Sequence, residues 1–510
     1  MQGKQGKSEL WCKTLAFGVT AMYRKTERQL PLENFYLPFS GELNPENRWV
    51  KLSKIIPWNV IEEKYASLFA KSGKGAPAKP VRMAFGALII KETLVLSDEE
   101  LVNQLTENPY LQYFIGLPEF QKEAPFDPSM MVHFRKRLNG QVMQEINELI
   151  CLEKKSDDRD PDDKNAPGGG SGKKNKGRLI IDATCAPADI RYPTDRSLLN
   201  EAREKLEMTI DTLYEPFKGQ MVKPRTYRRN ARKDYLYQAK AKKHHKKALR
   251  KAVGKQLRYV ARDIRIVKDL LNMDGHGTLS QKQEQQFQTI QKLYEQQQAM
   301  YDKKTNQIED RIVSISQPHI RPIVRGKARA QTEFGAKIFV SLVDGFAFVE
   351  KLDWNNFNEG TLLIDSIEKY RERYGYYPKV ACADRIFRNR KNLEFCKQNG
   401  IRLSGPRLGR PNIKKLKSQK RIEQMDNRIR NQIEGKFGEG KRCYGLGCIM
   451  AKLQETSECV IHLQFLVMNL QRKLQLLFVR FCLARFELSM LPSIRTFSGN
   501  PSYQRLEIAG

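Results

Sequence analysis

Two short apolar runs, far apart in the chain, each end in an aspartate. Leu179–Ile–Ile precedes Asp182, and Val380–Ala–Cys–Ala precedes Asp384. A carboxylate flanked by apolar strand residues is costly unless it binds a cation or forms an ion pair. Either aspartate alone could be an ordinary polar strand end. Together they predict two strands of one sheet whose carboxylates share a positive charge.

A third carboxylate follows the second strand. A basic amphipathic helix is expected to begin near Arg421 and carries Glu434. We expect Asp182, Asp384 and Glu434 to meet in space. Glu439 remains an alternative to Glu434. The glycines 435, 438 and 440 predict that this helix ends or bends just past Glu434.

The first aspartate also has alternatives. Asp189 and Asp195 are weaker candidates for the position given to Asp182.

The segment around these aspartates predicts a mixed α/β sheet flanked by helices. Residues 336–343 and 346–352 are β-rich and are joined by Asp344–Gly345, a strong hairpin signal. Helices are expected at 359–374 and 389–399, with a short strand at 401–404. This alternation of strands and helices predicts one α/β domain at 178–475, the domain that carries the three carboxylates.

A helical insertion, about 196–323, separates the first strand from the hairpin. Leu257, Val260, Ile264, Val267 and Leu271 form a heptad seam. After a glycine turn at 272–278, Phe287, Tyr294, Tyr301 and Ile308 recur every seven residues. These patterns predict a coiled-coil hairpin of two antiparallel helices. The basic segment 221–250 before it suits DNA contact or a solvated surface.

The remaining chain divides by composition. Residues 1–45 are expected to be a flexible arm, 152–177 a disordered linker rich in glycine and charge, and 476–510 a tail. Between arm and linker, 46–151 predicts an all-helical domain. Ser97 and Glu100 form a capping box, and Asp127–Pro128 starts another helix. Its short helices suit a helix-turn-helix DNA reader or a plain helical bundle.

Charge indicates the partner. The chain has 510 residues, 90 Lys and Arg against 58 Asp and Glu, and a formal net charge of +32. Such an excess favours a polyanion, with nucleic acid ahead of a membrane surface. Nine scattered cysteines without a C-x-x-C pair, and the lack of an uninterrupted apolar span, suit a cytoplasmic protein outside membranes.

Three carboxylates and few histidines point to magnesium. Two Mg²⁺ ions about 3.5–4 Å apart can activate a nucleophile and stabilise the leaving oxygen of a phosphodiester. Mg²⁺ prefers oxygen ligands, so carboxylates suffice, and the chain has only six histidines. We expect two ions, with Mn²⁺ as a substitute, held by Asp182, Asp384 and Glu434.

The spacing Arg430-x3-Glu434-x6-Lys441 is similar to the signature around the catalytic glutamate of DDE-type bacterial insertion-sequence transposases. Ile181–Asp182–Ala–Thr and Ala383–Asp384–Arg385 resemble their first two carboxylate segments. The N-terminal stretch LSDEELVNQLTENPYLQYFIGLP resembles their DNA-binding region. The chain departs from the fuller signature at Asn427, where relatives carry a tyrosine, and after Asp384, where many have a glycine turn.

The resemblance implies a ribonuclease H-like core that binds the transposon's terminal inverted repeats. It implies Mg²⁺-dependent strand cleavage and strand transfer on double-stranded DNA, by a dimer on transposon ends and target, in the bacterial cytoplasm at the nucleoid. The alternatives are a DNA-binding protein derived from a transposase, without catalysis, and a hydrolytic nuclease of the same fold. The expected DNA contacts are Arg135, Lys136, Arg137, Arg228, Arg229, Arg388, Arg430, Lys436, Lys441 and Arg442.

Overall fold

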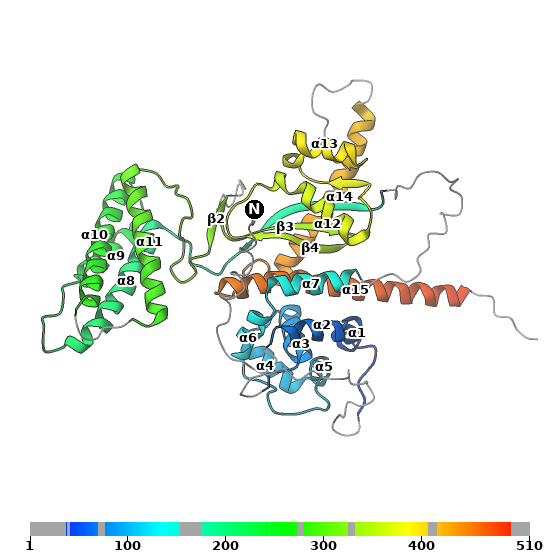
Figure 1. The fold of residues 1–510 in the computed structure, drawn as a ribbon, viewed down its shortest axis with the longest axis horizontal. Coiled ribbons are helices and arrows are strands. Elements are labelled where there is room, and N and C mark those ends of the chain that lie inside the picture. Colours follow the sequence, from blue (N-terminus) through cyan, green and yellow to red (C-terminus); the bar gives the residue numbers. More distant parts are fainter. Residues whose placement is uncertain are drawn as a thin grey trace, which may run out of the picture.

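The computed structural model describes residues 37, 41–69, 77–152, 175–243, 245–273, 279–324, 332–405 and 416–490, with backbone alone at 416–419 and 480–490. The expected arm at 1–45, the linker at 152–177 and the end of the expected tail lie largely outside these residues. Figure 1 shows a helical unit, a sheet with its helices, and a separate helical bundle.

The N-terminal unit is all-helical, as predicted. Its helices are α1 (Arg48–Ile55), α2 (Trp58–Ser67), α3 (Val81–Leu94), α4 (Asp98–Glu107), α5 (Pro109–Phe114), α6 (Met130–Arg137) and α7 (Gly140–Cys151). The Ser97 side chain accepts from the Glu100 N–H and caps α4 as expected. The helix expected from Asp127–Pro128 starts later, at Met130, because residues 127–129 form a turn in which Asp127 accepts from the Ser129 N–H.

One mixed sheet forms the centre of the second unit. Its strands are β1 (Arg178–Pro187), β2 (Arg321–Val324), β3 (Thr332–Val343), β4 (Phe346–Asp353), β5 (Val380–Cys382) and β6 (Arg402–Leu403). The order is β2-β3-β1-β5-β6, with β4 also paired to β3. β1 is antiparallel to β3 and parallel to β5, which is parallel to β6. The predicted hairpin is confirmed, with both turn residues at positive φ.

Helices cover both faces of this sheet. Alternate β1 residues Leu179, Ile181 and Ala183 belong to a core shared with α12 (Leu363–Tyr374) and α13 (Arg390–Gln398). Ile180 and Ala186 point to the opposite core, where α14 (Leu416–Cys443) and α15 (Gln454–Met490) pack. Because strand side chains alternate, Asp182 belongs to the α14 face.

The helix α14 does not end at Glu434, so the prediction of a break there is wrong. It continues to Cys443 through all three glycines. Gly440 lies against α15 and its loop: a Cβ there would be 3.1 Å from Leu446 Cδ2 and 3.2 Å from Met468 Sδ. A residue without a side chain is needed at 440 for this close approach. Packing of the helix against its neighbours outweighs the low helix propensity of the three glycines.

The helix α15 is shared by two cores. Leu463, Leu466 and Leu470 pack into the N-terminal helical core, whereas Ile461, Phe465 and Met468 pack beneath the sheet. The expected boundary between catalytic domain and tail, at 475/476, falls inside this helix. Figure 1 shows α15 running between the helical unit and the sheet.

A buried hydrogen-bond cluster joins the same two units. Asn469 of α15 accepts from the Ala347 N–H at 2.8 Å and donates to the Ala347 carbonyl at 2.7 Å. It also donates to the side chain of Asn147 on α7 at 2.8 Å. The N-terminal unit is therefore fixed to the sheet edge through strand β4.

The insertion is a bundle, which corrects the expectation of a two-helix hairpin. It contains α8 (Asp195–Tyr214), η4 (Glu215–Phe217), α9 (Arg228–Ala239), α10 (Lys246–Leu271) and α11 (Gln281–Lys303). The apolar face of α8 packs into the same core as α10 and α11. The sequence prediction did not include α8. It therefore assigned the apolar core to two helices, whereas α8, α10 and α11 share it. Figure 1 shows the bundle beside β2, set off from the sheet.

Two seam positions also differ. Leu270 is buried in place of Leu271, and Ile308 lies beyond the end of α11. Met300 and Ile290 are buried where a strict seven-residue repeat favours Tyr294 and Tyr301, which are only partly buried. Most of the turn expected at 272–278 lies outside the described residues.

Candidate active site

Asp182 lies in the middle of β1, on the face covered by α14. Its Oδ1 accepts a hydrogen bond from the Ala183 N–H at 2.8 Å. The neighbours Ile181 and Ala183 are buried on the other face of the sheet. The Asp182 carboxylate is thus half-buried, and both residues next to it in the strand are apolar.

Asp384 lies two residues beyond the end of β5, the strand parallel to β1. The register pairs Ile180 with Cys382, and each aspartate follows its paired residue by two positions. The two aspartates are therefore level on neighbouring strands and share a face. Asp384 is exposed, and its Oδ1 accepts from the Arg385 N–H at 2.7 Å, which caps the short helix η6 (Arg385–Phe387).

Arg430 connects the first and third carboxylates. Its Nη1 lies 3.6 Å from Asp182 Oδ2, and its Nη2 lies 2.9 Å from Glu434 Oε1. Ile429 and Ile433 are buried beneath the sheet and fix this turn of α14. Positions four apart share a helix face, so the spacing that places Arg430 over Asp182 also brings Glu434 to it.

Burial and neighbouring charges raise the pKa of Asp182 to about 6. Desolvation is the largest cause, and the negative charges of Glu359 and Asp384 add to it. The Ala183 N–H and the Arg430 guanidinium act in the opposite direction. A carboxyl held in this state gains from a cation, because a nearby positive charge favours its ionised form.

Glu359 is a member of this group that the sequence reasoning missed. It begins the short helix η5 (Glu359–Thr361), and its carboxylate lies 2.8 Å from Lys337 Nζ of β3. The only sequence signal was an Asn–Glu–Gly turn before a helix, where Asn358 accepts from the Gly360 N–H. That signal marks a turn and gives no indication of a site.

Within the described residues, no three His, Cys, Asp or Glu side chains are close enough together to hold a metal ion. Arg430 occupies the space between two of the three carboxylates and supplies the positive charge. The donors are all carboxylate oxygens, which is the chemistry that Mg²⁺ prefers. The donor chemistry therefore fits Mg²⁺, while Arg430 lies between two of the carboxylates in this structure.

The alternative residues pair with other side chains or lie beyond strand β1. Glu439 pairs with Lys436 at 3.1 Å and does not contact Arg430. Asp195 lies in the first turn of α8 and pairs with Arg311 at 2.6 Å. The Asp189 N–H and carbonyl bond to Ile449 and Gln317, beyond the strand that carries Asp182. The arrangement favours Asp182 and Glu434.

Two expected DNA contacts are internal. Arg135 is 7% exposed and holds Asp98 in a bidentate ion pair at 2.9 and 2.7 Å, so its assignment to DNA is wrong. Arg388 donates to the Leu403 and Ser404 carbonyls at 3.0 and 2.7 Å, which makes it a support for β6. Pattern alone could not reveal either partner, because both lie far along the chain.

The other expected contacts remain at the surface to different degrees. Lys136 is exposed, and Arg137 lies over the Phe69 ring at 4.6 Å. Arg228 is held by Asp211 at 2.7 and 2.9 Å, whereas its neighbour Arg229 is exposed. On α14, Arg442 is exposed, Lys441 is half-buried, and Lys436 is mostly covered beside Glu439.

Comparison with known proteins identifies the family. Residues 381–471 match the family described as "Transposase DDE domain", and residues 38–137 match "Transposase domain (DUF772)". An uncharacterized protein, ORF8 in the nfe locus of Rhizobium meliloti, is 32% identical over 164 residues, which is 32% of this chain and 73% of that protein. The chain belongs to the DDE transposases of insertion sequences.

Each transposase match covers part of one structural unit. The first runs from β5 through α13, β6 and α14 to residue 471 in α15, so it includes Asp384 and Glu434 but not Asp182. The second covers α1 to α6. No solved structure matches the chain. None of the helices in the described part of the transposase is long and apolar enough to cross a membrane.

Proposed function

We propose that this transposase binds the terminal inverted repeats of its insertion sequence, cleaves there and transfers the freed strand to target DNA. The observation that carries the proposal is the contact of Arg430 with both Asp182 and Glu434, with Asp384 level on the next strand. Arg430 on α14 thus links the carboxylates of Asp182 and Glu434, and Asp384 follows the end of β5, the strand next to that of Asp182.

The sheet order supports a ribonuclease H-like core. Without β2, the order is β4-β3-β1-β5-β6, with an antiparallel three-stranded half and a parallel half. The two aspartates lie where these halves meet, at the central strand β1 and its parallel neighbour. The helical insertion between β1 and β2 leaves that meeting point intact.

We further propose that Asp182 and Asp384 together hold one Mg²⁺ or Mn²⁺ ion, and that Glu434 completes a second site. Bound there, the ions would polarise the scissile phosphate and lower the pKa of the attacking water or 3′-hydroxyl. Asp182 would hold the ion in its ionised form. Arg430, with Lys441 and Arg442 on the same helix, would supply positive charge for the DNA phosphates.

Duplex DNA is the proposed partner of the wider surface. The net charge of +32 and the exposed cations Lys136 and Arg229 support binding through phosphates, which gives affinity that falls with salt. Reaction at two paired transposon ends favours a dimer on DNA. Because the proposed partner is bacterial DNA, the proposed location is the cytoplasm, at the nucleoid.

The test uses purified protein, Mg²⁺ or Mn²⁺, and DNA that carries the element's own ends. We expect joined products that disappear in Asp182→Asn, Asp384→Asn and Glu434→Gln and persist in Glu439→Gln. Glu439 is the matched control, since it lies on the same helix and pairs away from the site.

Three results would replace the proposal. Cleavage without joining would indicate a hydrolytic nuclease. Specific binding without cleavage by the unmutated protein would indicate a DNA-binding role alone. Loss of activity in Glu439→Gln with activity retained in Glu434→Gln would change the third ligand.

A further inference from the structure

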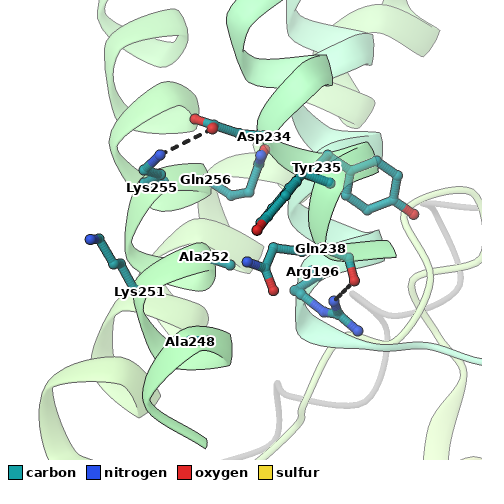
Figure 2. Close-up of a pocket in the computed structure, with 10 residues that line it drawn as sticks. Arg196, Asp234, Tyr235, Gln238, Ala248, Lys251, Ala252, Lys255 and Gln256 are labelled. Atoms are coloured by element: carbon teal, nitrogen blue, oxygen red, sulfur yellow. Dashed lines mark hydrogen bonds and ion pairs between the residues drawn. The ribbon is translucent and has the colours of Figure 1, made fainter. Parts of the chain in front are cut away.

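Glu359 forms an ion pair whose surroundings set it apart from a purely structural one. An ion pair can serve only to join two elements, as Asp234 of α9 and Lys255 of α10 do at 3.0 Å in the insertion (Figure 2). Glu359 pairs with Lys337 of β3 at 2.8 Å, but it also faces the candidate active site. Burial is the largest cause of the raised pKa of Asp182, and the negative charge of Glu359 adds to it.

The turn that carries Glu359 is fixed to the segment that follows Asp384. Gly360 approaches η6 so closely that a Cβ there would lie 2.7 Å from a backbone carbonyl oxygen of that helix. The Gly360 carbonyl accepts hydrogen bonds from the side-chain amides of Asn389 and Asn392, at 3.0 and 2.8 Å. Because Asp384 caps η6, these contacts fix the backbone of Glu359 beside that of Asp384.

Lys337 restrains the side chain of Glu359. Its Nζ donates to the Phe357 carbonyl at 2.7 Å and to Asn356 Oδ1 at 3.0 Å, and it lies 4.8 Å from the centre of the Phe357 ring. The Lys337 side chain is 13% exposed and that of Glu359 is 21% exposed. An amine that several groups hold keeps its position, so the glutamate paired with it is restrained as well.

The candidate site contains more acidic than basic side chains. Its four carboxylates belong to Asp182, Glu359, Asp384 and Glu434. Arg430 and Lys337 are the two cations that pair with them, and among the described residues Asp384 has no ion-pair partner. Two negative charges are therefore left over, which is the charge that one divalent ion offsets.

Direct coordination does not suit Glu359. In the part of the chain that the structure describes, no three acidic, histidine or cysteine side chains lie close enough to hold one ion, so Glu359 does not join both aspartates at that range. Mg²⁺ usually keeps several of its waters, and outer carboxylates of a metal site accept hydrogen bonds from its ligands.

From these contacts we infer that Glu359 is a positioning residue, whose carboxylate accepts hydrogen bonds from water bound to the ion proposed for Asp182 and Asp384. The inference rests on the proposed function for the ion. It adds a fourth carboxylate from the turn between β4 and α12, a segment that supplies none of the three proposed ligands.

The test measures Mn²⁺ binding by calorimetric titration of the full-length protein, without DNA and at one fixed pH. We expect Glu359→Gln to weaken Mn²⁺ binding about tenfold, because a neutral amide is a poorer acceptor for metal-bound water. Glu359→Asp keeps the charge but shortens the side chain, so it should also bind Mn²⁺ more weakly than the unmutated protein. Asp182→Asn, which removes a proposed ligand, should abolish binding.

The matched control is Asp365→Asn. Asp365 is exposed in the first turn of α12 and takes part in none of the contacts above, so its loss should leave Mn²⁺ affinity unchanged. Thermal unfolding in chelator should give Glu359→Gln a Tm close to that of the unmutated protein, which separates a metal effect from damage to the fold. Should Glu359→Gln fail to fold, Glu359→Asp, which keeps a charge for Lys337, decides the matter.

Three results would overturn the inference and leave the proposed function standing. Unchanged Mn²⁺ affinity in Glu359→Gln would remove any role for this side chain. Unchanged affinity in Glu359→Asp would make Glu359 a distant charge without a contact to bound water. Loss of binding as complete as in Asp182→Asn would make Glu359 a direct ligand. Absence of Mn²⁺ binding by the unmutated protein would instead count against the metal site of the proposed function.

Discussion

At the residue scale, the Arg430 guanidinium and the proposed divalent ion would compete for the same two carboxylates, Asp182 and Glu434. Arg430 lies between Asp182 and Glu434, where its charge offsets part of the cost of burying Asp182. A divalent ion would contribute the same kind of stabilisation with more charge. The guanidinium therefore holds the carboxylates of Asp182 and Glu434 near one another in the metal-free protein.

The first prediction concerns Asp182→Asn. Because the folded-state pKa of Asp182 is raised from 3.8 to about 6, the metal-free protein loses stability as pH rises through that interval. The amide removes the buried charge, so the variant should be about 2 kcal/mol more stable at pH 7. Urea unfolding in chelator measures the difference, which should vanish below about pH 4.

The control for that prediction is Asp384→Asn, because Asp384 is exposed on the neighbouring strand. It should change stability much less. An Asp182→Asn protein that is less stable than the parent at pH 7 would contradict the assigned burial cost.

The second prediction concerns Arg430→Gln. The change removes the cation that competes for Asp182 and Glu434, so Mn²⁺ should bind about two- to fivefold more tightly without DNA. Cleavage of DNA should fall, because the proposed phosphate contact is lost. Calorimetric titration with Mn²⁺ provides the measurement, and weaker Mn²⁺ binding would show that Arg430 supports the metal site directly.

Residues of the candidate site could be proposed from the sequence where a single apolar run or a single helix turn determines their position. Asp182 and Asp384 follow from apolar runs, and Glu434 follows from its spacing to Arg430. Glu359 and the partners of Arg135 and Arg388 were not predictable, because each depends on segments brought together only by the fold.

At the element scale, α14 shows how tertiary packing decides a helix that local propensity disfavours. Its three glycines predicted a break, yet Ile433 and Phe437 on either side of Gly435 are buried in one core. The hairpin of β3 and β4 was predictable, since an Asp–Gly turn is a local signal. The bundle was misjudged, because the apolar repeat of α8 at Leu199, Leu206 and Leu213 was not included in the predicted seam.

The third prediction contrasts two glycines of α14. A Cβ at Gly435 would meet nothing within 4 Å, so Gly435→Ala should raise the free energy of unfolding by about 0.5–1 kcal/mol. A Cβ at Gly440 would press on Leu446 and Met468, so Gly440→Ala should lower it by about 1 kcal/mol or more. Thermal unfolding of both variants tests the contrast, and the same sign for both would refute it.

At the scale of the whole molecule, the helical unit and the sheet are joined through the interior. The apolar faces of α15 enter both cores, and the Asn469 cluster closes the contact between α7 and β4. The insertion differs, since its core contains only its own helices and the loop after α11. The composition indicated separate domains, but the shared helix could not be seen from either pattern alone.

The fourth prediction tests that coupling with Asn469→Leu. The change removes the acceptor of the Ala347 N–H and one donor each from the Ala347 carbonyl and the Asn147 side-chain oxygen, which should cost about 2–4 kcal/mol. Hydrogen exchange should rise in α7 and β4 together, while α10 of the insertion stays protected. Gln398→Leu, at an exposed position of α13, should leave all three unchanged. A rise confined to β4 would contradict the coupling.

The position of α15 in the chain has a consequence for biosynthesis. Because α15 follows every other described element, a ribosome synthesises both the N-terminal helical unit and the strands of the sheet before the helix that fills their cores. Until then each unit exposes the apolar surface that α15 will cover. A chain that stops before α15 would therefore leave both cores open rather than release a finished helical unit.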